Sequence, residues 1–142
     1  QAMERYHELV VTRHFGGLEA EDASLEQVEA VLLYFGGGPE VTASRLGCLA
    51  CNAAIELAPT AQTSQASTDR YLARVRDAFG HALANAQTAG RLTSDAPVAE
   101  LAAFLTVTVT GMLVLIRAGT DATYLRATAQ QALDRVRHFA VA

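Results

Sequence analysis

The sequence predicts an all-α protein, an orthogonal or antiparallel bundle of about six helices. Apolar residues recur at three- and four-residue spacing along most of the chain, as on one face of a helix. Glycine, proline and polar clusters divide these stretches into helix-length pieces, and no strand–turn–strand pattern competes with them. The 142 residues, 51% of them hydrophobic, are most simply one domain over residues 1–142 with a substantial core.

Charge and the chain ends restrict the class of protein. The net charge is −4, lysine is absent, and the arginines are dispersed, so this segment is not expected to bind DNA by itself. No signal peptide is visible, and we expect a cytoplasmic protein that does not enter a membrane. Because Gln1 falls inside a helical pattern and is not methionine, we interpret the chain as a fragment that lacks its N-terminal part.

Two helices are predicted before residue 36. The first covers residues 1–15 and ends at two glycines, and its inward stripe is predicted to be Met3, Tyr6, Val10 and His14. An acidic connection then leads to Ser24, which forms a capping-box pattern with Gln27 and opens the second helix. The predicted core face of the second helix is Leu25, Val28, Val31, Leu32 and Phe35.

The middle of the chain predicts one short and one long helix. Gly36 to Pro39 should form a loop, and an apolar helix should run over residues 44–58 until Pro59 ends it. Residues 60–68 are polar and are predicted as a loop that leads into a long helix reaching Ala89, with Gly90 as a left-handed stop. The core face of this long helix is predicted to be Leu72, Val75, Phe79, Leu83 and Ala86.

The helix from Pro97 to Ala118 is the centre of the predicted fold, with Asp95 as its expected cap and Gly119 as its stop. It carries no charge between Glu100 and Arg117, which predicts burial on all sides, by the chain itself and by a second copy. This uncharged part is too short to span a membrane and contains threonines. We assign one stripe to the chain's own interior (Leu101, Phe104, Thr108, Met112 and Leu115) and the opposite one to a partner (Ala102, Thr106, Val109, Leu113 and Arg117), although the reverse assignment is also open.

The last helix is predicted over residues 121–139, with Asp121 as its cap. Its stripe contains small residues, which permit close approach of another helix. We therefore predict a homodimer through the last two helices. The predicted interface residues are Thr106, Val109, Leu113, Leu125, Ala129, Ala132, Leu133 and Val136.

Three segments in the same order resemble the regulatory domain of TetR-family transcriptional repressors. GCLACNAAIELAP (residues 47–59) is similar to the opening of that family's sixth helix, and AQTAGRL (residues 86–92) to the close of its seventh. DAPVAELAAFLTVTVTGMLVLIRAGTD (residues 95–121) resembles the eighth helix and the turn into the ninth. The resemblance covers essentially the whole chain, from the family's fourth helix to its ninth.

The resemblance implies a ligand-binding and dimerisation domain whose DNA-reading helix-turn-helix lies upstream of Gln1. In that family, the eighth and ninth helices of two subunits pair, and a small molecule bound between the fourth to eighth helices changes the spacing of the two DNA heads. We expect an apolar or weakly polar effector, because no arginine falls among the predicted lining residues. These are Tyr6, Val10, His14, Leu32, Phe35, Cys48, Cys51, Asn52, Ile55, Val75, Phe79, Phe104, Thr108 and Met112.

Other chemistries have weaker support in the sequence. Cys48 and Cys51 form a CxxC, but a zinc site needs two further ligands at suitable spacing, and we interpret both as small core or pocket residues. Glu4 and His7 have the spacing of half a di-iron site, whose second half is missing, and we expect both to be solvated or locally hydrogen-bonded. We predict no enzyme, metal or cofactor. The alternatives to a regulator are a helical module that carries an apolar molecule and a purely structural dimer.

Overall fold

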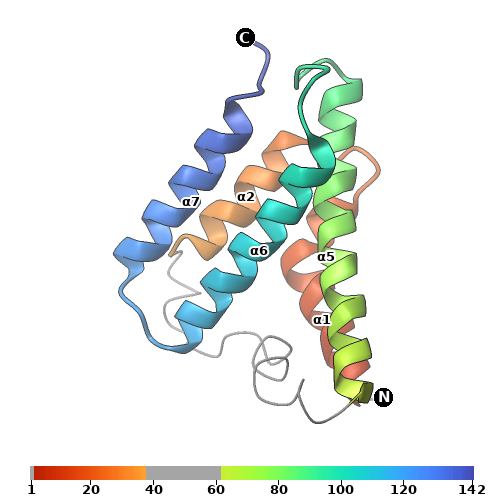
Figure 1. The fold of residues 1–142 in the computed structure, drawn as a ribbon, viewed down its shortest axis with the longest axis vertical. Coiled ribbons are helices and arrows are strands. Elements are labelled where there is room, and N and C mark those ends of the chain that lie inside the picture. Colours follow the sequence, from red (N-terminus) through yellow and green to blue (C-terminus); the bar gives the residue numbers. More distant parts are fainter. Residues whose placement is uncertain (1, 38–61) are drawn as a thin grey trace.

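The computed structural model describes residues 2–37 and 62–142, and this part of the chain is helical without a strand (Figure 1). The helices are α1 (Ala2–Phe15), the 3-10 helix η1 (Gly16–Glu19), α2 (Leu25–Phe35), α5 (Gln62–Thr88), α6 (Val98–Arg117) and α7 (Ala122–Arg137). The all-α prediction is confirmed. The helix predicted over residues 44–58 lies outside the described residues.

Helix α6 lies at the centre of the bundle, between α5 and α7 and across α2, while α1 runs alongside α5 (Figure 1). Its most extensive packing is against α5. The core contains a cluster of aromatic rings from three helices, in which Phe15 lies 5.6 Å from Phe35 and 6.1 Å from Phe79 between ring centroids. These three side chains are at most 1% exposed, so the ends of α1 and α2 are fixed on the middle of α5.

The buried face of α1 is offset by one residue from the predicted stripe. His7, Val11 and Phe15 are buried, whereas Tyr6 and Val10 are only partly covered. The chain also continues beyond Phe15 as η1, and the fully buried Leu18 anchors this short helix. Phe15 and Leu18 both lie in the core. The face of α1 that packs on α5 is therefore the one that carries Phe15 together with Val11 and His7, four and eight residues earlier.

Helix α2 begins and ends where its sequence signals predict. Helix α5 begins earlier than predicted. Ser24 and Gln27 form the predicted capping box, in which the backbone N–H of Ser24 donates to Gln27 Oε1 at 2.8 Å. The predicted loop at residues 60–68 is wrong from Gln62 onward, because α5 begins there. Ser67 and Thr68 are buried, and packing against the rest of the fold therefore overrides the weak helix propensity of this polar stretch.

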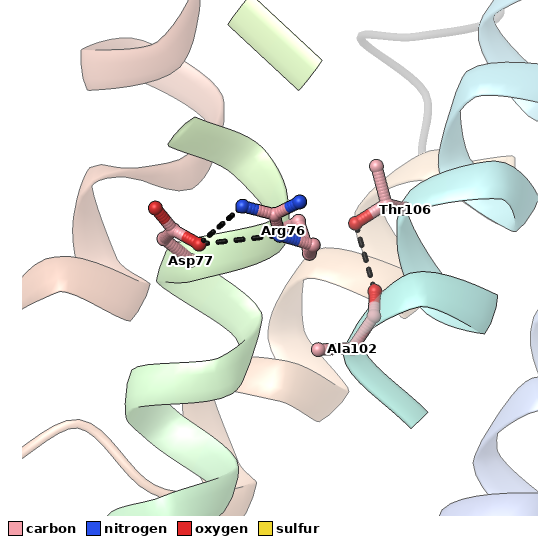
Figure 2. A network of polar contacts seen from close by, with 4 residues as sticks. All are labelled: Arg76, Asp77, Ala102 and Thr106. Carbon is pink, nitrogen blue, oxygen red and sulfur yellow. Dashed lines mark hydrogen bonds and ion pairs between the residues drawn. The ribbon is translucent and has the colours of Figure 1, made fainter. Parts of the chain in front are cut away.

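Three threonines of α6 satisfy their hydroxyl groups within the helix itself. Thr106, Thr108 and Thr110 each donate to the carbonyl oxygen four residues earlier, at 2.8, 2.8 and 2.7 Å. Figure 2 shows the Thr106–Ala102 bond, with the Arg76–Asp77 ion pair of α5 nearby. This back-bonding explains how an apolar helix accommodates so many hydroxyl groups. The predicted cap is wrong: Pro97 occupies the N-cap position, and the exposed Asp95 does not cap the helix.

Helix α6 is long and apolar enough to cross a membrane by length and composition, and 44% of its most apolar window is buried inside the protein. A single helix of this kind is weak evidence for a membrane, because core helices of soluble proteins have the same properties.

The predicted glycine stops and the final cap are present. Gly90 and Gly119 have φ of +73° and +74°, a conformation in which residues with a Cβ are strained. Asp121 accepts a hydrogen bond from the backbone N–H of Thr123 at 2.8 Å and so caps α7. The chain after α7 is fixed to the α5–α6 connection, because the backbone N–H of Thr93 donates a hydrogen bond to the carbonyl oxygen of Phe139 at 2.8 Å.

Candidate functional site

The predicted pocket residues do not converge on one cavity in the described part of the chain. Five of them are closely packed core residues, at most 1% exposed: Leu32, Phe35, Val75, Phe79 and Met112. Phe104 is 42% exposed, and Thr108 lies only partly covered one turn further along α6. Tyr6, Val10 and His14 are half-buried, and Cys48, Cys51, Asn52 and Ile55 lie outside the described residues.

Both predicted stripes of α6 contribute to the chain's own core. From the stripe assigned to a partner, Ala102, Thr106, Val109 and Leu113 are buried. From the opposite stripe, Leu101 and Met112 are buried, while Phe104 and Leu115 are exposed. The apolar stripe of α7 is also buried within the chain. All eight predicted interface residues are 1–7% exposed within a single chain: Thr106, Val109, Leu113, Leu125, Ala129, Ala132, Leu133 and Val136. A single chain therefore already covers these side chains, and their role in a dimer interface stays a prediction.

The small residues of α7 permit a close approach within the chain. A Cβ built on Gly36, at the end of α2, would lie 2.8 Å from the Cβ of Ala129. The missing side chain of Gly36 and the short one of Ala129 together let α2 and α7 come into contact. The sequence correctly indicated close helix packing, but the partner helix belongs to the same chain.

A partly polar cleft lies between α1 and α5, with a volume of about 370 Å³. We call it the α1–α5 cleft. Its lining residues come from the first three turns of α1 and the first half of α5: Glu4, His7, Glu8, Val11, Ser67, Arg70, Tyr71 and Arg74. This volume is within the range of small-molecule sites.

His7 is the most unusual side chain in the α1–α5 cleft. It is 6% exposed, and its Nδ1 shares a hydrogen bond of 3.0 Å with the Ser67 hydroxyl. The ring of Tyr71 lies 5.2 Å away between centroids. The other ring nitrogen, Nε2, is buried and has no hydrogen-bond partner among the described residues. An unsatisfied buried polar atom costs about 1–3 kcal/mol, so a natural protein that retains one requires an explanation.

Burial lowers the pKa of His7 below its usual value, because desolvation disfavours the imidazolium form. The hydrogen bond to Ser67 and the charge of Glu4 oppose this shift, whereas the charge of Arg70 adds to it. His7 is therefore neutral at pH 7. In either tautomer, the buried Nε2 has one donor or acceptor that no described residue uses.

The two arginines at the rim of the cleft are paired with glutamates. Arg70 donates to Glu4 at 2.7 Å, and both side chains are largely exposed. Arg74 binds Glu19 through two nitrogens at 2.8 and 3.1 Å, which raises the pKa of Arg74. The cleft therefore has a neutral hydrogen-bonding centre and a rim whose two cations are compensated.

The His7–Ser67 pair lacks one element of a hydrolytic triad among the described residues. A serine nucleophile needs a histidine base whose second nitrogen is oriented by a third group. Within residues 2–37 and 62–142, Nε2 of His7 has no such partner.

Sequence reasoning did not identify His7 and Ser67 as site residues. His7 was expected to be solvated or locally bonded and Ser67 to lie in a loop, yet both are buried and in contact across α1 and α5. One signal was present: His7, Val11 and Phe15 are spaced four residues apart, so a core position for Phe15 implies one for His7. For Ser67, the sequence offered no comparable signal.

The helical bundle and its cleft define an all-α domain with a pocket of small-molecule size. The profile of a family described as "Tetracyclin repressor-like, C-terminal domain" matches residues 24–133, and the chain belongs to this family. The family consists of ligand-responsive transcriptional regulators, and its regulatory domains are typically non-enzymatic. No curated protein and no solved structure matches the chain.

Proposed function

We propose that residues 1–142 are the effector-binding and dimerisation half of a transcriptional repressor whose helix-turn-helix precedes Gln1. The observation that carries the proposal is the α1–α5 cleft, with its buried and unsatisfied His7 Nε2, in a chain of this family. The cleft borders the first three turns of α1, the helix that would continue directly from the DNA-reading head.

The cleft suggests how an effector acts on DNA binding. A ligand that hydrogen-bonds to His7 and packs on Tyr71 contacts α1 and α5 together, and it favours one relative position of these helices. A DNA head attached to α1 moves with it, so the spacing of the two heads in a dimer changes. The effector shifts the equilibrium between the DNA-binding and the DNA-released arrangement of the heads, and it does so only by the difference between its affinities for these two states.

The effector is an uncharged or weakly polar molecule. Arg70 and Arg74 line the cleft, contrary to the expectation that no arginine would, but each is already bound to a glutamate. An anionic ligand would have to displace one of these carboxylates. Cys48, Cys51, Asn52 and Ile55 remain predicted contributors to the site.

The homodimer forms through the outer face of α6. Its exposed stripe consists of Phe104, Val107, Gly111 and Leu115, of which Val107 is 73% exposed. The space around Gly111 is open, since a Cβ there would meet no atom within 4 Å. A second copy of α6 can approach closely at this glycine and bury the apolar side chains on either side of it.

The protein extended by its upstream segment should bind a specific DNA duplex, whereas residues 1–142 alone should not. Non-specific DNA affinity arises from lysine and arginine at phosphates, and this segment carries a net charge of −4 without lysine. Fluorescence anisotropy titrations of both proteins at physiological salt provide the measurement.

The same titration separates the regulator from its alternatives. Tight sequence-specific binding by residues 1–142 would contradict the proposal, as would an upstream coding sequence without a short basic helix-turn-helix. If the upstream sequence lacked a helix-turn-helix, a helical module that carries an apolar molecule would explain the protein better.

The double variant His7→Phe/Ser67→Ala should retain the fold but lose the response to effector. Removing both hydrogen-bonding partners together with the unsatisfied Nε2 should leave the melting temperature unchanged or raise it, because paired apolar replacements are nearly neutral or stabilising. DNA release should be measured with compounds selected by the thermal shift of the wild type.

A matched control for this variant is Leu9→Ala, which changes an exposed residue of α1 outside the cleft. Its effector response should equal that of the wild type. If the double variant still releases DNA at wild-type effector concentrations, the cleft is not the effector site.

A further inference from the structure

A second pocket, of about 290 Å³, lies between the last turn of α1 and the outer face of α2. We call it the α1–α2 pocket. Arg13, His14, Gln27 and Tyr34 contribute its polar and aromatic groups, and Ala30 and Val31 contribute apolar surface. The α1–α2 pocket shares no lining residue with the α1–α5 cleft, so the two sites are separate.

The aromatic rings of the α1–α2 pocket form a surface on which a flat molecule can lie. The rings of His14 and Tyr34 are 5.4 Å apart between centroids and tilted by only 34°. Phe35 supports both from the core, at 5.7 Å from His14 and 5.2 Å from Tyr34. Phe35 is 1% exposed, so this support comes from a fully packed core residue.

Arg13 contributes a positive charge to the pocket that no ion pair between described residues compensates. Each glutamate of η1 and α2 forms an ion pair with an arginine other than Arg13: Glu19 with Arg74 at 2.8 Å, Glu26 with Arg91 at 2.6 Å and Glu29 with Arg137 at 2.7 Å. On α1, Glu4 is bound to Arg70, and Glu8 lines the α1–α5 cleft. Among the described residues, none forms an ion pair with Arg13.

Two further donors lie at the same pocket. Gln27 uses its Oε1 to cap α2, which leaves its side-chain Nε2 available as a donor. The hydroxyl group of Tyr34 is the other. Burial and the neighbouring charge of Arg13 both lower the pKa of His14, so its ring is neutral at pH 7 and does not replace Arg13 as the cation.

We propose that the α1–α2 pocket binds a small aromatic carboxylate. The guanidinium of Arg13 pairs with the carboxylate, and arginine provides two parallel N–H donors for this purpose. The aromatic ring of the ligand lies against His14 and Tyr34, and Gln27 and Tyr34 supply additional hydrogen bonds. The volume of about 290 Å³ limits the ligand to one or two rings. The proposal does not depend on DNA binding or on the α1–α5 cleft.

The test is a titration of the isotopically labelled 142-residue protein, followed by amide NMR spectra, with benzoate as the probe. Benzamide serves as the neutral analogue, and inorganic phosphate as the anion without a ring. The variants are Arg13→Gln and Tyr34→Ala. The matched control is Arg5→Gln, which removes the same charge from an exposed position of α1 outside both pockets.

Benzoate should shift the amides of Gly17, Ala30 and Val31 in a saturable way, while benzamide and phosphate should bind about tenfold more weakly or not at all. Arg13→Gln should weaken benzoate binding about tenfold, and Arg5→Gln should leave it within about twofold of the wild type. Tyr34→Ala should also weaken it, because the ring loses one of its supports.

Several results would overturn the proposal. Equal binding of benzamide would remove the role of the carboxylate, and equal binding of phosphate would show a general anion site. Equal weakening by Arg5→Gln would indicate a non-specific charge effect. The absence of saturable shifts in the wild type, or shifts confined to the α1–α5 cleft, would show that the α1–α2 pocket is not the benzoate site.

Discussion

Val107→Glu should convert the protein from a dimer to a folded monomer at micromolar concentration. Val107 is 73% exposed and lies in the middle of the outer stripe of α6, so glutamate there costs the single chain little. In the proposed dimer, the same carboxylate would be buried twice without a partner. Desolvation of an unpaired charge costs several kcal/mol, which weakens the dimer by about a hundredfold or more.

Sedimentation equilibrium of both proteins measures this effect, and circular dichroism checks that the helix content is unchanged. A suitable control is Leu33→Glu, which places the same charge at an exposed leucine of α2. The control should remain a dimer. A monomeric wild type, or dissociation of Leu33→Glu without dissociation of Val107→Glu, would refute the proposed interface.

Leu133→Glu should destabilise the protomer itself. The sequence alone places Leu133 in a dimer interface, where a charge would only separate two folded chains. In the structure, Leu133 is 3% exposed inside one chain. Burial raises the pKa of a carboxyl by up to about 3–5 units, so keeping the buried glutamate protonated at neutral pH costs up to about 4 kcal/mol. Burial of its polar atoms without partners adds to this cost, and the sum is a large part of the stability of a domain of this size.

Thermal denaturation followed by circular dichroism is the appropriate measurement. Leu133→Glu should lose most of its cooperative transition, and Leu133→Met, which conserves volume, should cost less than about 1.5 kcal/mol. A Leu133→Glu protein that melts like the wild type but sediments as a monomer would instead restore the interface predicted from the sequence.

Local sequence signals predicted the helices well where they depend on neighbouring residues. The capping box of Ser24 and Gln27, the glycine stops at Gly90 and Gly119 and the cap at Asp121 all appear as expected. Each of these features satisfies or terminates a helix end within a few residues. They are therefore encoded locally, and a single sequence is sufficient to find them.

The candidate site was less predictable, because it depends on helix rotation. A turn of 100° per residue means that shifting the buried stripe of α1 by one position exchanges Tyr6 and Val10 for His7 and Val11. Only the need to bury Phe15 and Leu18 together selects between the two faces. The α1–α5 cleft follows from contacts between segments about 60 residues apart in the chain, which no local sequence signal records.

The sequence by itself determined that this protein is all-α, where most of its helices end, and that it resembles a family of ligand-responsive regulators. Only the tertiary structure decided which faces of α1 and α6 are buried. Helix α6 is apolar all round, so its composition cannot distinguish the side that packs on α5 from the side that is exposed. The small residues of α7 would permit close packing either against a second copy or against α2 of the same chain. In the structure, Ala129 of α7 lies close to Gly36 at the end of α2, so these small residues pack within the chain.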